Sequence, residues 1–201
     1  MNVALRQPLM TRDQFLCWVQ TQEGRYEFDG FQPVAMFQPV AMTDGTRNHS
    51  QICQNIYLAL GTRLRGTDCR VLGLDAGLAT TGDAVRYPDA LVTCTKSPGS
   101  ALLIPGVVVV FEVLSPNSEC IDRIDKPREY RAVPSIRRYV ILEHRSAGLT
   151  VFSRNAGTAD WTATTLTAGE TLDMPELGIG VPVDGFYEDV DLPGSPVAAE
   201  A

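Results

Sequence analysis

The stretch from Val107 to Leu114 reads VVVVFEVL, an apolar run with a single charged residue, Glu112. Its apolar residues stand at both odd and even positions, which is typical of a strand that is covered on both faces of its sheet. A lone carboxylate in such a strand is costly to bury unless a cation, a partner or a proton compensates its charge. Either Glu112 lies near the strand end and reaches solvent or an arginine, or it serves a function that requires its charge.

A second acid stands at the head of another apolar strand, Tyr87 to Cys94. Asp89 follows Pro88, and proline is tolerated at the beginning of a strand. A loop containing KSPGS separates this strand from the first, so the two could pair antiparallel and bring Asp89 beside Glu112. Two neighbouring carboxylates repel each other unless a metal ion or a proton lies between them. Oxygen ligands suit Mg²⁺ or Mn²⁺, whereas zinc prefers histidine or cysteine.

The patterns around these two strands predict an α/β or α+β sandwich of helices and sheet. Three helices are expected: one from Thr11, which has capping-box spacing to Gln14, one from Asn48 to Arg65, and one around Lys126 to Val133. The expected strands are a hairpin in YEFDGFQPVAM, a four-strand meander (70–74, 77–81, 87–94 and 107–114), and three strands in RYVILEH, LTVFSR and WTATTL.

Length and composition predict one domain, because the chain has 201 residues of which 44% are hydrophobic and 20% charged. We assign residues 1–190 to this domain and expect 191–201, rich in Pro, Ala and Gly, to be a flexible tail. The chain start lacks a signal-peptide layout, and the longest apolar stretch is too short to cross a bilayer. We therefore expect a cytoplasmic protein without membrane contact.

The cysteines form an odd set of five with no CxxC spacing, at positions 17, 53, 69, 94 and 120. This pattern argues against a disulfide framework and against a thiolate zinc site. We therefore expect reduced and mostly buried thiols.

The net charge of -7 does not favour general adhesion to nucleic acid, because phosphate binding requires lysine and arginine. Any DNA contact must be local. Basic residues outnumber acids between Cys120 and Arg138, which indicates either a solvated helix face or a local contact surface.

A tandem duplication occupies Phe31 to Met42, where FQPVAM occurs twice in succession. Six residues preserve the two-residue alternation of a strand, and the prolines restrict such a strand to a sheet edge or a protruding hairpin. Two short copies do not make a repeat protein.

Several short motifs, in order, resemble the Uma-type endonucleases of the PD-(D/E)XK superfamily. They are YEFDG at 26–30, His49 with Ile52, RYPD at 86–89, EVLSP at 112–116, Asp122-Arg123 with Lys126 and Tyr130, and PSI at 134–136 before Tyr139-Val140. The resemblance runs from about Thr11 to Val190 and includes the closing PELGIGVPVDGFYEDV. It implies a restriction-endonuclease-like fold, with a mixed central sheet flanked by helices.

The resemblance also implies a metal site and a reaction. Mg²⁺ or Mn²⁺ would be held by Asp89, Glu112 and the main-chain carbonyl of Val113, with Glu27 as a further ligand, directly or through water. Lys126 would take the role of the superfamily lysine, orienting the attacking water or stabilising the transition state. The expected reaction is hydrolysis of phosphodiester bonds in DNA.

The helix that carries Lys126 contains a proline at position 127. If the helix began at Asp122, Pro127 would fall in its second turn and cost roughly 3 kcal/mol. We therefore expect the helix to begin at Asp125 or within two residues of it, with Asp125 as N-cap and the Lys126 amine directed at Asp89 and Glu112.

Three further residues are possible substrate contacts. His49 either makes a local hydrogen bond at a helix start or contacts phosphate or water. Arg123 is the next candidate for the lysine role, and Tyr130 either packs beside Lys126 or belongs to the core.

Two functions remain open at this point. The first is a metal-dependent DNA endonuclease, for which we expect a homodimer because cutting two strands usually takes two sites. The second is a non-catalytic module that keeps the nuclease fold and binds nucleic acid or protein, since a fold does not imply an activity.

Overall fold

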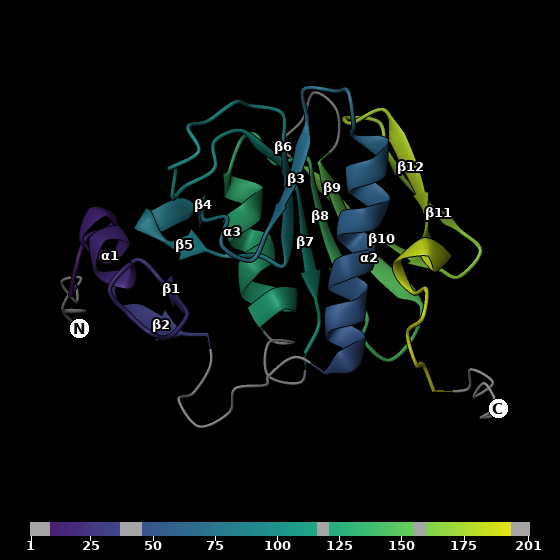
Figure 1. Cartoon of the computed structure of the whole chain (residues 1–201), viewed down its shortest axis with the longest axis horizontal. Coiled ribbons are helices and arrows are strands. Elements are labelled where there is room, and N and C mark those ends of the chain that lie inside the picture. Colours follow the sequence, from purple (N-terminus) through teal and green to yellow (C-terminus); the bar gives the residue numbers. More distant parts are fainter. Residues whose placement is uncertain (1–8, 37–45, 116–120, 155–159, 194–201) are drawn as a thin grey trace.

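The computed structural model describes residues 9–36, 46–115, 121–154 and 160–193, and it has a mixed α+β fold (Figure 1). Its main sheet has six strands in the order β10-β9-β8-β7-β6-β3. These are β3 (Arg70–Gly73), β6 (Ala90–Thr93), β7 (Val107–Val113), β8 (Arg138–Leu142), β9 (Gly148–Arg154) and β10 (Trp161–Thr167). The central pair β7 and β8 is parallel and the other pairs are antiparallel. The predicted mixed sheet flanked by helices is confirmed.

The two faces of this sheet are covered by two helices (Figure 1). Helix α2 (Arg47–Arg63) presents a buried stripe that includes Ile52, Ile56 and Leu60, and this stripe packs with Val109, Phe111 and Val113 of β7. Helix α3 (Lys126–Ala132) connects β7 to β8 and covers the other face, where its Tyr130 packs with Val110. Because side chains alternate along a strand, Glu112 has the same parity as Val110 and faces α3.

A short hairpin of β11 (Thr171–Met174) and β12 (Ile179–Pro182), followed by the 3₁₀ turn η3 (Val183–Phe186), extends the core over α2. The sequence analysis did not predict these strands. Asp191, where the tail was expected to begin, exchanges two hydrogen bonds with Asn48 of α2, at 2.6 and 3.1 Å. The chain is therefore attached to the domain at this point, and residues 194–201 lie outside the described part.

A second, smaller sheet has the order β2-β1-β5-β4 and packs against helix α1. Its elements are α1 (Arg12–Val19), β1 (Tyr26–Phe28), β2 (Pro33–Ala35), β4 (Leu78–Ala79) and β5 (Val85–Arg86), with the 3₁₀ turn η1 (Thr81–Asp83) between the last two. The predicted four-strand meander is therefore wrong. The 77–81 segment leaves the main sheet to pair with β5, so that β3 pairs directly with β6.

Local predictions in this region are confirmed. Thr11 and Gln14 form both hydrogen bonds of the capping box. The Asp29-Gly30 turn joins β1 to β2, and β2, which contains Pro33, is an edge strand. Gly30 has φ +91°, and a Cβ there would lie 2.1 Å from the carbonyl oxygen of Gly82, so only glycine fits. The second FQPVAM copy, 37–42, falls outside the described residues.

One cysteine prediction is wrong, because Cys69 and Cys94 form a disulfide. The pairing of Arg70 with Thr93 across β3 and β6 places these two cysteines opposite each other, one residue beyond the paired segments. Cys17 is an exposed free thiol and Cys53 a buried one. Among the described residues, no helix is both long enough and apolar enough to span a bilayer.

Candidate active site

The two predicted acids lie on adjacent strands at the same end of the main sheet. Ala90 of β6 pairs with Phe111 of β7, so Asp89 and Glu112 are the next residues along. The carboxylate of Asp89 accepts a hydrogen bond of 2.7 Å from the backbone N–H of Val113. This bond fixes Asp89 at the end of β7.

Glu112 points toward α3 and is 4% exposed. Its Oε1 accepts hydrogen bonds from the Lys126 amine at 2.7 Å and from the Tyr130 hydroxyl at 3.1 Å. Burial raises the pKa of Glu112 well above its usual value. The charge of Lys126 opposes this shift, while Asp122 and Asp89 add to it. Burial and the two neighbouring acids therefore outweigh the effect of Lys126 on the pKa of Glu112.

Lys126 lies buried between two carboxylates. Besides Glu112, its amine contacts Asp122 Oδ1 at 2.8 Å. Burial lowers the pKa of Lys126. The negative charges of Glu112, Glu27 and Asp122 raise it by a larger amount, so the net shift is upward. The predicted direction of the amine is confirmed for Glu112, and its second partner is Asp122.

The α-helix begins at Lys126 as predicted, but the mechanism differs. A π-helical turn, η2 (Ile121–Asp125), precedes it, so Asp125 has helical backbone angles and its side chain caps nothing. The N-cap prediction is therefore wrong. In a π turn, the donor missing from Pro127 would have served the carbonyl of Asp122, five residues earlier. That carbonyl accepts a 2.9 Å bond from the Tyr139 hydroxyl.

Glu27 belongs to a buried ion-pair network centred on Arg86. Arg86 donates to Glu27 Oε2 at 2.9 Å and to both carboxylate oxygens of Glu129 in α3, at 2.8 and 2.5 Å. The N–H of Tyr87 donates to Glu27 Oε1 at 3.2 Å. This network connects the small sheet to α3, close enough to the site that the charge of Glu27 raises the pKa of Lys126.

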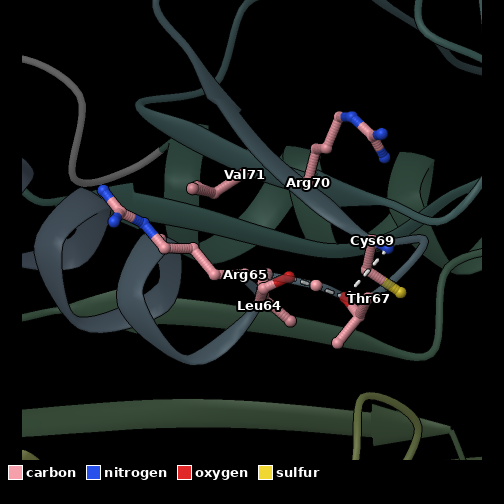
Figure 2. Close-up of a pocket in the computed structure, with 8 residues that line it drawn as sticks. Leu64, Arg65, Thr67, Cys69, Arg70 and Val71 are labelled. Carbon is pink, nitrogen blue, oxygen red and sulfur yellow. Dashed lines mark hydrogen bonds between the residues drawn. The ribbon is translucent and has the colours of Figure 1, made fainter.

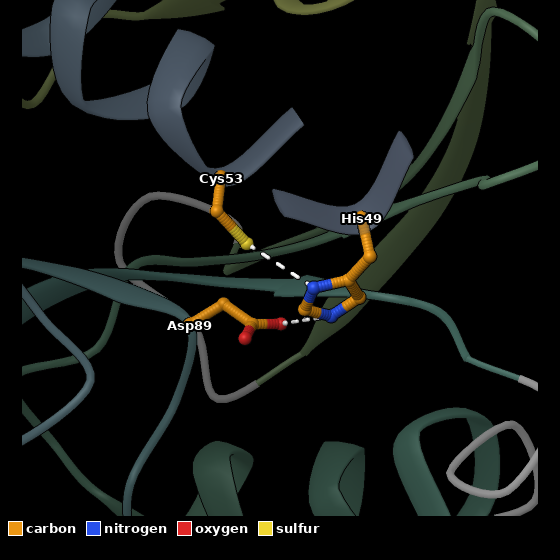
Figure 3. Close-up of side chains that lie close together, drawn as sticks. All are labelled: His49, Cys53 and Asp89. Carbon is orange, nitrogen blue, oxygen red and sulfur yellow. Dashed lines mark hydrogen bonds and ion pairs between the residues drawn. The ribbon is translucent and has the colours of Figure 1, made fainter. Parts of the chain in front are cut away.

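The imidazole of His49 lies between Cys53 and Asp89 (Figure 3). Its Nδ1 is 3.6 Å from the Cys53 sulfur, and its Nε2 is 3.6 Å from Asp89 Oδ2. Burial lowers the pKa of His49, but the hydrogen bond and charge of Asp89 and the carbonyl of Val113 outweigh it, so the net shift is upward. His49 is therefore part of the site, in addition to its backbone contact with Thr46 at the helix start. These three side chains are a group that could hold a metal ion.

The other two possible substrate contacts are placed differently. Tyr130 is fully buried and donates to Glu112, so it contacts the site from the core side. Arg123 is half-buried and forms a 2.6 Å ion pair with Glu143. The Tyr130 side chain is therefore shielded from solvent, and the Arg123 guanidinium is engaged by Glu143.

Sequence reasoning assigned no role to three residues of the site, Cys53, Asp122 and Arg86, although Asp122 and Arg86 stand in the motifs of the resemblance. The first two had a usable signal, because Cys53 follows His49 by four residues and Asp122 precedes Lys126 by four, and such pairs share a helix face. Arg86 had no such signal, because its partners are 59 and 43 residues away in the sequence.

A surface pocket of about 300 Å³ lies elsewhere, between the end of α2 and β3 (Figure 2). It is lined by Leu64, Arg65, Thr67, Cys69 and neighbouring residues. None of the candidate site residues lines this pocket, so we place the candidate active site at Asp89 and Glu112 and not here.

Comparisons with known proteins agree with the motif resemblance. The family described as "Uma2: Putative restriction endonuclease" matches residues 12–184 of this chain. A Synechocystis sp. protein, "Uncharacterized protein slr1290", is 28% identical over 183 residues, which cover 90% of this chain and 92% of that protein.

Proposed function

This chain belongs to the Uma2 family, and from that membership we propose that it is a Mg²⁺- or Mn²⁺-dependent endonuclease that hydrolyses phosphodiester bonds in DNA. The observation that carries the proposal is that Asp89 and Glu112 stand at the same end of two adjacent strands of the central sheet and that Lys126 pairs with Glu112.

The local charge supports a cation at this place. Among the described residues, the carboxylates of Glu27 and Glu129 pair with Arg86, those of Glu112 and Asp122 pair with Lys126, and that of Asp89 lies beside His49. An uncompensated carboxylate is costly in a buried setting, which the raised pKa of Glu112 reflects. Oxygen donors of this kind fit a hard divalent ion such as Mg²⁺ or Mn²⁺.

We assign the ligands to Asp89, Glu112 and the carbonyl of Val113, with Glu27 contributing directly or through water. When bound, the ion supplies a water of lowered pKa and neutralises charge on the scissile phosphate. Because Glu27 is held by Arg86 and Tyr87, its contribution through water disturbs fewer existing bonds than direct ligation.

Lys126 acts in this proposal as a cation and hydrogen-bond donor. Its pKa is raised, so the amine keeps its proton at neutral pH and cannot serve as the general base. It can orient a water or stabilise the charge that develops on the phosphate in the transition state.

The DNA contact must be local because the chain carries a net charge of -7. Arg128, Arg131 and Arg137 are exposed on α3 and the segment that follows it, and we assign phosphate contacts to them. Cleavage of both strands would use two copies of the chain, so we propose a homodimer, which sedimentation analysis can test.

The function is tested by incubating the protein with supercoiled, linear and single-stranded DNA in Mg²⁺, Mn²⁺ or EDTA. We expect metal-dependent cleavage that falls at least 100-fold in Asp89→Asn and in Glu112→Gln. The exposed Glu23→Gln serves as the matched control and should retain full activity. Cleavage that survives both site substitutions would come from a contaminant and would contradict the proposal, as would inactivity of the native protein on all three DNA forms.

A further inference from the structure

We propose that His49, Cys53 and Asp89 form a second metal site, one that binds a thiophilic divalent ion of the zinc class. The site lies on the α2 side of the sheet, whereas Lys126 and Tyr130 hold Glu112 on the α3 side.

Two of the ligands come from one helix face. His49 and Cys53 are four residues apart in α2, the spacing at which helical side chains project in the same direction and at which paired histidines commonly bind zinc. Asp89 approaches from the start of β6, and Figure 3 shows the three side chains converging. One ligand atom from each residue lies within 4.8 Å of the others.

These spacings are close to those that an ion requires. Zinc binds nitrogen at about 2.0 Å and sulfur at about 2.3 Å, so ligands of one tetrahedral ion lie about 3.5 Å apart. The Cys53 sulfur and His49 Nδ1 are already 3.6 Å apart. Asp89 contacts the other ring nitrogen, Nε2, so an ion bound at Nδ1 requires the Asp89 carboxylate to move from Nε2 toward the Cys53 sulfur, within a group whose ligand atoms already lie within 4.8 Å of one another.

The surroundings offer a fourth ligand and a route to solvent. The carbonyl of Val113 is close enough to His49 to raise the pKa of its ring. The side chains of His49 and Asp89 are 20% and 14% exposed, so an ion can reach them without opening the core. Three side-chain ligands leave a position for this carbonyl or for water.

The order of contacts, Cys53 to His49 to Asp89, also resembles a nucleophile, base and orienting acid. The environment of the sulfur argues against that role. Burial, followed by the charges of Asp89 and Glu112, raises the pKa of the Cys53 thiol far above its usual value, so the reactive thiolate is not formed at neutral pH. A divalent cation reverses this balance, because it binds the thiolate and offsets the same two acidic charges.

The ligand set selects the ion. Nitrogen, sulfur and one carboxylate favour Zn²⁺ and its relatives over Mg²⁺, which prefers oxygen ligands alone. Asp89 belongs both to this set and to the ligands of the proposed nuclease centre. The consequence that Zn²⁺ binding inhibits Mg²⁺-dependent cleavage rests on the proposed function, whereas the binding itself does not.

Cobalt(II) is the probe, because it substitutes for zinc and gives a near-ultraviolet charge-transfer band only when a thiolate binds it. The titration uses the full chain with Cys17 and Cys120 replaced by serine, which leaves Cys53 as the one thiol outside the disulfide. We expect the band to saturate at one equivalent of Co²⁺ and to disappear when Zn²⁺ is added.

Substitutions identify the ligands. Cys53→Ala should abolish the band, and His49→Gln should weaken Co²⁺ affinity at least tenfold while leaving the thiol in place. His49 is half-buried at the start of α2, whereas Cys53 is buried in the core. If Cys53→Ala fails to fold, His49→Gln still tests the site. Gln54→Ala, exposed on the same helix, is the matched control and should bind Co²⁺ normally.

Three results would overturn the site: no thiolate band in the native background, a band that persists in Cys53→Ala, or an affinity unchanged by His49→Gln. Each is read without DNA, so none depends on the nuclease assay. Conversely, a protein that binds Co²⁺ as expected but cleaves no DNA would refute the proposed function and leave this site standing.

Discussion

Lys126 should be a structural cation as well as a candidate catalytic one, and Lys126→Met tests this role. The amine is buried within 2.7 Å of Glu112 and 2.8 Å of Asp122. Methionine keeps most of the apolar stem but removes the charge, leaving both carboxylates without their shared cation. Removing one partner of a buried ion pair costs about 3 to 5 kcal/mol.

This loss of stability should appear as a lower melting temperature, Tm. For a domain of this size, 1 kcal/mol shifts Tm by about 2 to 4 °C, so the variant should melt roughly 6 to 20 °C below the native protein at pH 8. The exposed Arg128→Met, on the same helix, is the matched control and should melt within about 2 °C of the native protein.

The pH dependence gives a second, independent readout. Burial raises the pKa of Glu112, and removal of Lys126 takes away the charge that opposes this shift. A carboxyl whose folded pKa is raised favours folding at low pH, and this contribution is lost as the pH rises from the unfolded pKa, about 4.3, through the folded value. The Tm deficit of Lys126→Met should therefore be smaller at pH 5 than at pH 8. A deficit below 2 °C at pH 8, or one that grows on acidification, would refute the buried-pair argument.

The remaining predictions concern stability elsewhere. Arg86→Met leaves the buried Glu27 and the half-buried Glu129 without their common partner and should lower the free energy of unfolding, measured in urea, by about 3 to 5 kcal/mol; a loss below 1 kcal/mol would contradict the network. Reducing the disulfide, which closes a loop across 25 positions, should cost about 3 kcal/mol, and the double variant Cys69→Ala, Cys94→Ala should melt alike with and without reductant. Gly30→Ala should destabilise more than Gly82→Ala, because both have positive φ but only the first would clash; equal melting temperatures would contradict this.

Much of the local structure follows from the sequence. The apolar run of β7, interrupted by Glu112, predicted a strand covered on both faces, and the four-residue recurrence of Ile52, Ile56 and Leu60 is the pattern of a helix such as α2. The turn at Gly30 and the edge position of Pro33 were also predictable. Each of these features depends on residues that are near neighbours in the chain, so periodicity and backbone preference are sufficient to indicate them.

The site is only half predictable in the same way. Glu112 is conspicuous because a charge in an apolar strand requires an explanation, and Asp89 because it heads the next such strand. Which groups surround them depends on strand order and register, which bring together segments far apart in the chain. The sequence carried no signal that β4 leaves the main sheet, that Cys69 therefore faces Cys94, or that Arg86 joins two distant carboxylates.

The sequence by itself determined the three helices, the central strands, the two central acids and the position at which the α3 helix begins. Tertiary structure alone decided that Lys126 is shared by Glu112 and Asp122, and that His49 and Cys53 converge on Asp89. The physical reason is the distance along the chain over which each property is set. Helix and strand patterns are set within a few residues, whereas the electrostatics of a buried site depend on every charge that packing brings within a few ångströms.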